Sequence, residues 1–105
     1  MNELDRYDDL AEIAKALAHP VRLYILDFLK NQSCCYTGQL TEDFPFSQPT
    51  ISTHLKVLKE AGLIKGEIET PKTRYCLHLE NWSRAEALLN SFMDNRRTQS
   101  VNDVC

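Results

Sequence analysis

Four cysteines are the side chains of this sequence best suited to bind a soft ion or to undergo redox chemistry: Cys34, Cys35, Cys76 and Cys105. Adjacent Cα atoms lie about 3.8 Å apart. A disulfide usually spans roughly 4.4–6.8 Å, so a bond within the Cys34–Cys35 pair would be strained. Two neighbouring thiolates can instead share one ion, because soft sulfur ligands select soft ions over zinc or magnesium. We expect these cysteines to be reduced, with metal or redox chemistry rather than a disulfide framework.

A second set of candidate binding groups lies in residues 47–64, SQPTISTHLKVLKEAGLI. Ser47 is a favourable N-cap, Pro49 suits a first helical turn, and Gly62 suits a left-handed C-terminal cap. One face of this helix is apolar, with Ile51, Leu55 and Leu58. The other face carries groups suited to DNA base edges and phosphates: Gln48, Thr50, Ser52, Thr53, His54 and Lys56. An ordinary surface helix is the alternative, although such helices usually present mostly Lys and Glu.

The elements that position these residues follow from apolar periodicity and from breaks at proline and glycine. Helices are expected over residues 7–18 and from Pro20 to about residue 30. A short β-prone piece at 34–36 and a short helix at 37–43 come before the helix that starts at Ser47. Two strands, 63–68 and 73–79, form a hairpin, and Asn81 caps a last helix. The order predicts a mostly α fold with a small β-hairpin, a winged helix-turn-helix with extra N- and C-terminal dimerisation helices.

The chain of 105 residues is expected to hold one domain over residues 1–95 and a flexible tail over 96–105. The apolar stripes of the first and last helices are wider than one small domain can cover. A symmetric homodimer would bury them and would place two recognition helices about 34 Å apart, which matches successive major grooves. The alternative is that both stripes pack within one chain.

Charge distribution bears on the choice of partner. The net charge is −3, which does not by itself favour nucleic acid. Residues 1–13 hold five acidic residues against one basic residue, whereas residues 47–74 hold five basic against three acidic. The basic residues of 47–74 include Lys72 and Arg74 in the predicted hairpin. Their side chains can contact DNA phosphate or simply keep the hairpin solvated. No apolar run of membrane-spanning length and no signal-peptide pattern is present, so we expect a cytoplasmic protein without a membrane partner.

Three segments carry a family resemblance: residues 14–26 (AKALAHPVRLYIL), residues 47–58, and residues 60–64 followed by 74–77. They are similar to the opening signature, the recognition helix and the wing of the ArsR/SmtB family of metal- and arsenic-responsive repressors. The resemblance implies a homodimer, not an enzyme, that leaves its double-stranded DNA operator when an effector binds. It places Gln48, Thr50, Ser52, Thr53 and His54 at DNA-reading positions, although Thr53 replaces a larger or cationic side chain common there.

The effector is expected to be As(III), Sb(III) or an organic arsenical, with no cofactor required for DNA binding. The family's zinc sensors use histidines and carboxylates on the last helix, which has no histidine here. In a winged helix the short strand pairs with the return strand of the wing, so Cys34 or Cys35 is expected to face Cys76. These three cysteines are the predicted ion ligands. A thiol redox or persulfide switch is the alternative effector mechanism, and a protein-interaction module without DNA binding is the alternative function.

Overall fold

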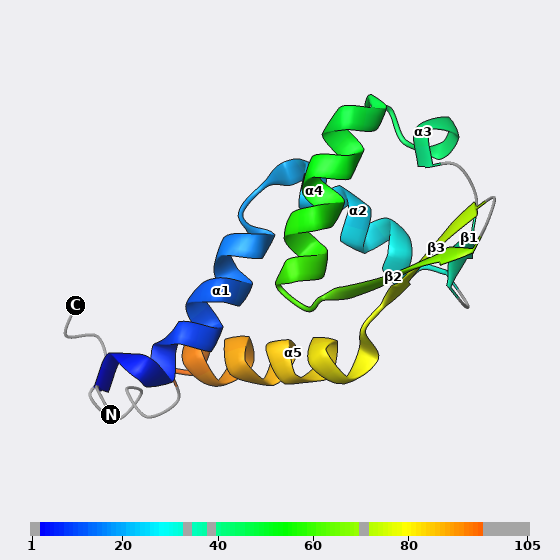
Figure 1. Cartoon of the computed structure of the whole chain (residues 1–105). Helices are drawn as coiled ribbons and strands as arrows, with labels where there is room; N and C mark the ends of the chain where they lie inside the picture. Colours follow the sequence, from blue (N-terminus) through cyan, green and yellow to red (C-terminus); the bar gives the residue numbers. More distant parts are fainter. Residues whose placement is uncertain (1–2, 33–34, 38–39, 70–71, 96–105) are drawn as a thin grey trace.

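The computed structural model describes residues 3–32, 35–37, 40–69 and 72–95. Its elements are arranged as a helix-turn-helix and hairpin flanked by two outer helices (Figure 1). In the described residues the helices are η1 (Glu3–Tyr7, a 3-10 helix), α1 (Asp8–Leu17), α2 (Pro20–Lys30), α3 (Leu40–Asp43), α4 (Gln48–Glu60) and α5 (Leu79–Met93). The strands are β1 (Tyr36–Thr37), β2 (Ile64–Glu69) and β3 (Lys72–Leu77). The predicted winged helix-turn-helix architecture is therefore confirmed.

Local chemistry sets the start of α2. His19 is extended, with φ −156° and ψ 131°, because the residue before a proline is disfavoured in the helical region. Pro20 then occupies the first turn, where its missing N–H has no helical partner to lose. The His19 imidazole caps the helix, since its Nδ1 accepts a hydrogen bond from the Val21 amide at 3.1 Å. The break between the first two helices lies where the sequence predicts it.

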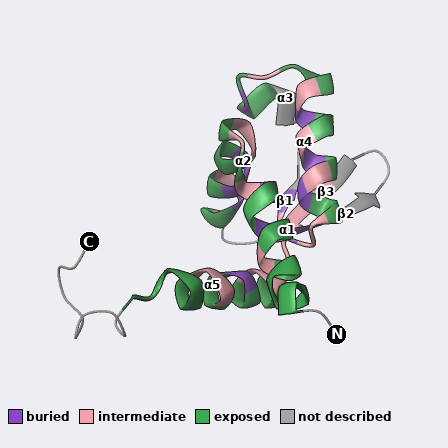
Figure 2. Ribbon diagram, turned by 90° about the vertical axis from the view of Figure 1, so that its left-hand side faces the viewer, coloured by how far each residue is buried: buried purple, intermediate pink, exposed green. Residues whose placement is uncertain are grey.

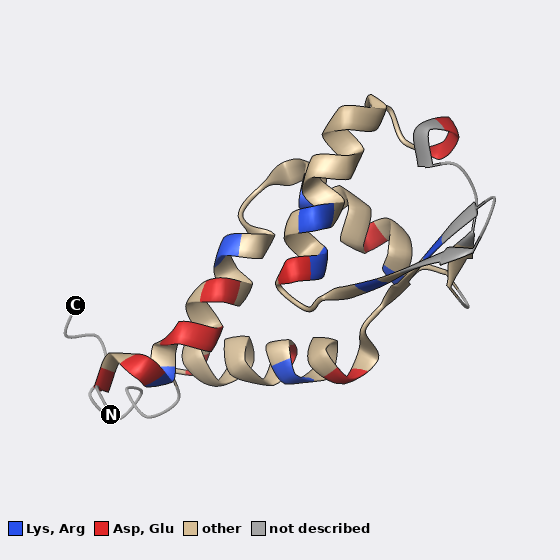
Figure 3. Cartoon of the chain, in the orientation of Figure 1, with Lys and Arg blue, Asp and Glu red and all other residues tan. Residues whose placement is uncertain are grey.

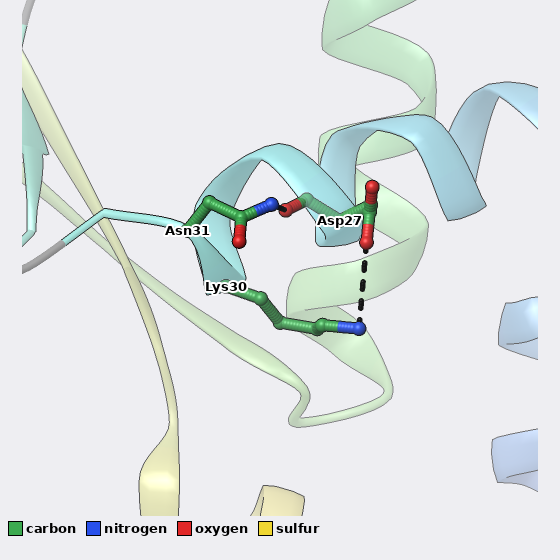
Figure 4. A network of polar contacts seen from close by, with 3 residues as sticks. All are labelled: Asp27, Lys30 and Asn31. Atoms are coloured by element: carbon green, nitrogen blue, oxygen red, sulfur yellow. Dashed lines mark hydrogen bonds and ion pairs between the residues drawn. The ribbon is translucent and has the colours of Figure 1, made fainter.

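The end of α2 carries a small polar network (Figure 4). The Asn31 side-chain amide donates to the backbone carbonyl of Asp27 at 2.8 Å, so it satisfies one of the carbonyls that a helix end leaves without a partner. Lys30 Nζ lies 3.4 Å from a carboxylate oxygen of Asp27. This ion pair is exposed, so we expect it to add only about 0–1 kcal/mol. These contacts stabilise the C-terminal end of α2 and do not form a binding site.

The sheet has three antiparallel strands in the order β1-β3-β2. Tyr36 pairs with Tyr75 and Thr37 with Arg74, while Ile64 at the start of β2 pairs with Leu77. The prediction that a short strand pairs with the return strand of the hairpin is confirmed. The predicted helix over residues 37–43 is too long at its start, because Thr37 is drawn into this ladder and α3 covers only Leu40–Asp43.

The core lies where α4 meets the other elements (Figure 2). Three residues of the predicted α4 stripe are almost completely buried, with Ile51 1%, Leu55 6% and Leu58 0% exposed. They pack in one cluster with buried residues from α1, α2, α5 and the segments next to α4, among them Ile13, Ile25, Leu29, Phe44, Leu63 and Ala85. Burying an aliphatic side chain of this kind contributes about 1.5–3 kcal/mol. The core therefore fixes which face of α4 points outward.

The outer helices bury only part of their apolar stripes. Helices α1 and α5 contact each other, and an Arg84–Asp9 ion pair joins them. On η1 and at the C-terminal end of α5, however, four large apolar side chains stay exposed: Leu4, Tyr7, Phe92 and Met93. Packing within one chain therefore leaves the apolar surface that the predicted dimer would cover. Among the described helices, none combines the length and the apolar composition needed to cross a membrane.

The predicted N-cap of the last helix is wrong. Helix α5 begins at Leu79, and His78 caps it by accepting the Asn81 amide on Nδ1 at 3.2 Å. The Asn81 side chain instead donates to the carbonyl of Gly62 at 2.9 Å. Gly62 has φ +80°, as the predicted left-handed cap of α4 requires. Asn81 thus ties the end of the recognition helix to α5.

We expect Gly62→Ala to lower the free energy of unfolding by about 1–2 kcal/mol, because a left-handed conformation strains any residue with a Cβ. The added Cβ would also lie 2.9 Å from the Asn81 amide nitrogen. Urea denaturation followed by circular dichroism measures the effect at fixed protein concentration. Ser91→Ala on the exposed face of α5 is the control, with an expected change within about 0.5 kcal/mol. Equal stability of the Gly62 variant and the wild type would contradict the strain at this cap.

Candidate nucleic-acid interface and sulfur site

The N-terminus of α4 is capped as the sequence predicts. Ser47 is extended, with φ −72° and ψ 159°, and its Oγ accepts the Thr50 amide at 3.4 Å. Pro49 lies in the first turn. Pro49 has no N–H, and the Thr50 and Ile51 amides both donate to Ser47. The small hydroxyl groups and the positive end of the helix dipole are therefore the features here that favour a phosphate.

The outward face of α4 presents polar side chains that are already organised. Gln48 Nε2 donates to Ser52 Oγ at 2.8 Å, and Thr53 Oγ1 donates to the Pro49 carbonyl at 2.9 Å. Gln48, Ser52, Thr53 and Lys56 are all exposed. An amide and hydroxyls on one helix face are hydrogen-bonding groups of the kind that read base edges in a major groove.

His54 differs from its neighbours because it lies on the inner edge of α4. It is half-buried, and its ring centroid lies 4.2 Å from that of His19. Its Nδ1 lies 3.1 Å from an Arg22 guanidinium nitrogen. Arg22 can only donate, so His54 accepts on Nδ1 and carries its proton on Nε2. The same guanidinium donates to the Ala16 and Lys15 carbonyls at 2.7 and 3.1 Å, which closes the C-terminal end of α1.

The contacts of Arg22 and His19 with His54 were not predicted from the sequence. One signal was available in the sequence. Arg22 lies in the first turn of α2, where the helix dipole disfavours a cation. A cation at such a position needs a specific acceptor, and here the acceptors are the carbonyls that end α1. This cluster joins α1, α2 and α4 at one corner of the molecule.

Charge is distributed unevenly over the helices and strands (Figure 3). Acidic residues gather along η1 and α1, whereas basic residues occur on α4 and on the hairpin. Lys56, Lys59 and Lys65 are exposed, and Arg74 is half-buried in β3. Lys72 begins β3, but its side chain lies outside the described part of the chain. These cations therefore lie on the recognition helix and the hairpin, and their contact with phosphate stays a prediction.

The structure joins Cys35 and Cys76 in a disulfide, with their Cα atoms 4.5 Å apart. Extending the β1–β3 register by one residue places Cys35 directly opposite Cys76, as the strand-pairing prediction requires. The expectation that these two sulfurs are free thiols differs from the observed bond, because the antiparallel ladder brings their Cβ atoms within bonding reach. Cys34 and Cys105 lie outside the described residues, so the role of Cys34 as an ion ligand stays a prediction.

Two shallow hollows flank this sulfur pair. One, of about 240 Å³, is mainly apolar and includes Leu29, Tyr75 and Leu77. The other, of about 290 Å³, includes Lys65 and Arg74. Arg74 Nη2 lies 3.7 Å from Cys35 Sγ. A guanidinium at this distance favours the thiolate of a reduced cysteine, which is the form that attacks electrophiles and binds metals.

The described residues contain no group of three or more His, Cys, Asp and Glu side chains placed to hold a metal. They supply two adjacent sulfurs, and Cys34 is the nearest further sulfur in the sequence. His19, His54 and His78 are all engaged on Nδ1, in helix caps or with Arg22. Among the described side chains, the two sulfurs are those whose chemistry suits a soft ion best.

We expect stability to fall with acidity through His54. Burial lowers the pKa of His54 from its usual value of about 6.5, and the neighbouring His19 and the Arg22 cation lower it further. As the pH falls, His54 therefore takes up a proton at a higher pH in the unfolded chain than in the folded protein. The stabilisation is complete above pH about 6.5 and is lost as the pH falls through that value to the lower folded-state pKa.

Urea unfolding of the wild type and His54→Gln at several pH values, at one protein concentration, tests this expectation. The stability difference between the two proteins should shrink from pH 7.5 to pH 5.5. A difference that is constant over this range would show that His54 does not titrate in this way.

Comparison with known proteins agrees with this geometry. The model for "Bacterial regulatory protein, arsR family" matches residues 19–65. The arsenical resistance operon repressor of Staphylococcus xylosus is 40% identical over 74 residues, covering 70% of each chain. The cadmium sensor CmtR of Mycobacterium tuberculosis is 35% identical, with a TM-score of 0.56 over 76% of this chain and 81% of that one.

A further solved structure is the homodimeric winged helix-turn-helix DNA-binding domain of Mb0332 from Mycobacterium bovis. It is 25% identical, with a TM-score of 0.65 over 94% of this chain and 93% of the other. The sequence matches extend from the helix-turn-helix into the flanking elements, and the structural match extends over nearly the whole chain. The chain therefore belongs to the arsR family of bacterial regulatory proteins, which are DNA-binding transcriptional regulators rather than enzymes.

Proposed function

We propose that the protein is a homodimeric repressor that leaves its operator when a thiophilic ion, As(III) or Sb(III), binds thiolates of Cys34, Cys35 and Cys76. The observation that carries this proposal is the position of Cys35 opposite Cys76, between the short strand and the wing. An ion held there connects two elements that flank the recognition helix. No cofactor is needed for DNA binding itself.

DNA binding is supported by the polar outer face of α4 and by the cations of α4 and the hairpin. The exposed apolar side chains of Leu4, Tyr7, Phe92 and Met93 give a second copy a surface to cover. The similar Mb0332 domain is a homodimer. A two-fold pair would present two α4 helices to half-sites about one helical turn apart.

The proposed ion site requires reduced sulfurs. Three thiolates suit pyramidal As(III) or Sb(III), while the two described sulfurs are enough for an organic arsenical. Similarity to an arsenical resistance repressor favours arsenic, and similarity to a cadmium sensor makes Cd²⁺ the comparison ion in a titration. Each 1.4 kcal/mol of coupling free energy between ion binding and operator binding lowers the operator affinity about tenfold.

The disulfide supports a second candidate, a redox switch. A peroxide would oxidise both thiols, forming the Cys35–Cys76 bond and two waters while it is itself reduced. With a polysulfide, one thiolate would attack a terminal sulfur and become a persulfide, with a polysulfide one sulfur shorter as the leaving group. The second thiolate would then attack the inner sulfur of the persulfide and displace hydrosulfide, which closes the disulfide. Arg74 favours Cys35 as the attacking thiolate in either case.

We expect Lys56→Gln to weaken binding by a similar factor for every duplex tested, because a lysine on a phosphate carries no sequence information. The slope of log affinity against log salt should fall by about 1 for each Lys56 in the dimer. Fluorescence anisotropy on duplex DNA from upstream of the gene measures both. Lys30→Gln on α2 is the control with an unchanged slope. If the wild type fails to bind this DNA even at low salt, the protein-interaction alternative is favoured.

Single serine variants test the sulfur site. Arsenite should lower the operator affinity of the reduced wild type by about 10- to 100-fold. We expect Cys34→Ser, Cys35→Ser and Cys76→Ser to bind DNA within about threefold of the wild type but to lose most of this release, because each removes one ligand. Cys105→Ser is the matched control and should respond normally. Normal arsenite release by both Cys34→Ser and Cys35→Ser would refute the ion site.

Two measurements distinguish the redox switch from the ion sensor. Under a metal chelator, release by peroxide or polysulfide alone, reversed by a dithiol, supports the switch. A sulfur-to-arsenic absorption band with loss of three free thiols per subunit supports the ion sensor.

A further inference from the structure

The residue next to the sulfur pair is physically connected to the helix-turn-helix. Tyr36 follows Cys35, is 8% exposed and pairs with Tyr75 in the ladder. Its hydroxyl donates a hydrogen bond to the carboxylate of Asp43, the last residue of α3. Burial raises the pKa of Tyr36 and the bond to Asp43 raises it further, so the hydroxyl remains a donor. Tyr36 therefore connects the residue next to it, Cys35, with the end of α3.

A row of aromatic rings continues from Tyr36 toward α4. Phe28 makes edge-to-face contacts with Tyr36 at 5.2 Å and with Phe44 at 4.8 Å. Tyr24 makes the same kind of contact with Phe44 and with Phe46, both at 5.4 Å. Phe46 immediately precedes Ser47, the N-cap of α4. The row therefore runs from the residue beside Cys35 to Phe46, which lies next to the N-cap of the recognition helix.

Two features make this row suited to transmit a change. Its rings touch edge to face, an arrangement with a defined geometry rather than a sliding contact. Phe44 is 4% exposed and packs in the same core cluster as Ile51 of α4. A closely packed core repacks between discrete arrangements instead of deforming smoothly.

We propose that the Tyr36–Asp43 hydrogen bond, with the rings behind it, couples the state of Cys35 to the orientation of α4. Tyr36 is thus a positioning residue for effector release. This inference rests on the proposed function, because it supplies the connection between the sulfur site and the DNA-binding face. It adds a role for residues that touch neither the effector nor DNA.

Tyr36→Phe tests the connection because it keeps the ring and removes only the hydroxyl. Tyr24→Phe is the matched control, since it removes a hydroxyl from another ring of the same row. Operator affinity of each reduced protein is measured on upstream duplex with and without arsenite, or with peroxide if that releases the wild type. Effector uptake is followed separately by the sulfur–arsenic absorption band or by loss of free thiols.

We expect reduced Tyr36→Phe to bind DNA within about threefold of the wild type and to take up the effector fully. Its release factor should fall at least fivefold, against a usual coupling range of about 5- to 150-fold. With arsenite, binding linkage adds a readout that a merely structural role would not change. Operator DNA should weaken arsenite binding to the wild type by the same factor as arsenite weakens DNA binding, and this reciprocal effect should also fall in Tyr36→Phe.

A second variant, Asp43→Asn, removes the carboxylate from the other side of the bond. The double variant with Tyr36→Phe should lose no more coupling than either single variant, because both remove the same interaction.

Release of Tyr36→Phe equal to that of the wild type would overturn the inference while leaving the proposed sensor intact. Loss of effector uptake or of basal DNA binding in this variant would also overturn it, since Tyr36 would then only support the fold. Failure of the proposed function has a different signature, because the wild type itself would not be released by arsenite or by an oxidant.

Discussion

Burial of the apolar stripe of α4 is the constraint on which the rest of the structure depends. Ile51, Leu55 and Leu58 are each at most 6% exposed, and they contact layers from both ends of the chain. A helix turns by about 100° per residue, so fixing this stripe also fixes the direction of every other side chain on α4. Gln48 and Ser52 must then face outward. The polar face that we propose to bind DNA is a consequence of the core rather than a separate feature.

The pairing of β1 with β3 is the second determinant, because it brings an early segment of the chain against the wing. Only two residues form β1, yet their register is sufficient to place Cys35 opposite Cys76. The same short strand presents Tyr36 to Asp43. The pairing of β1 with β3 therefore positions both the sulfur pair and the contact with the helix-turn-helix. Arg74 lies beside Cys35 on the return strand, β3.

Much of the fold was predictable because its signals are local. Pro20, Ser47 and Gly62 each act through their own backbone geometry, and the limits of α2 and α4 follow from them. The errors arose where a distant partner competes with local preference. Thr37 is helical by sequence position but joins β1 when β3 is beside it. Asn81 is a good N-cap residue, yet its side chain is used by Gly62 from another part of the chain.

By itself, the sequence determined the winged helix-turn-helix order, the polar face of α4 and the set of cysteines with relevant chemistry, since each is set by residue type and spacing. Only the tertiary structure decided that His54 faces Arg22 and that Cys35 is the sulfur beside Cys76. It alone connected Tyr36 to Asp43. These pairs join residues from separate elements, and their contacts depend on how the core packs those elements together, which periodicity along one helix or strand does not encode.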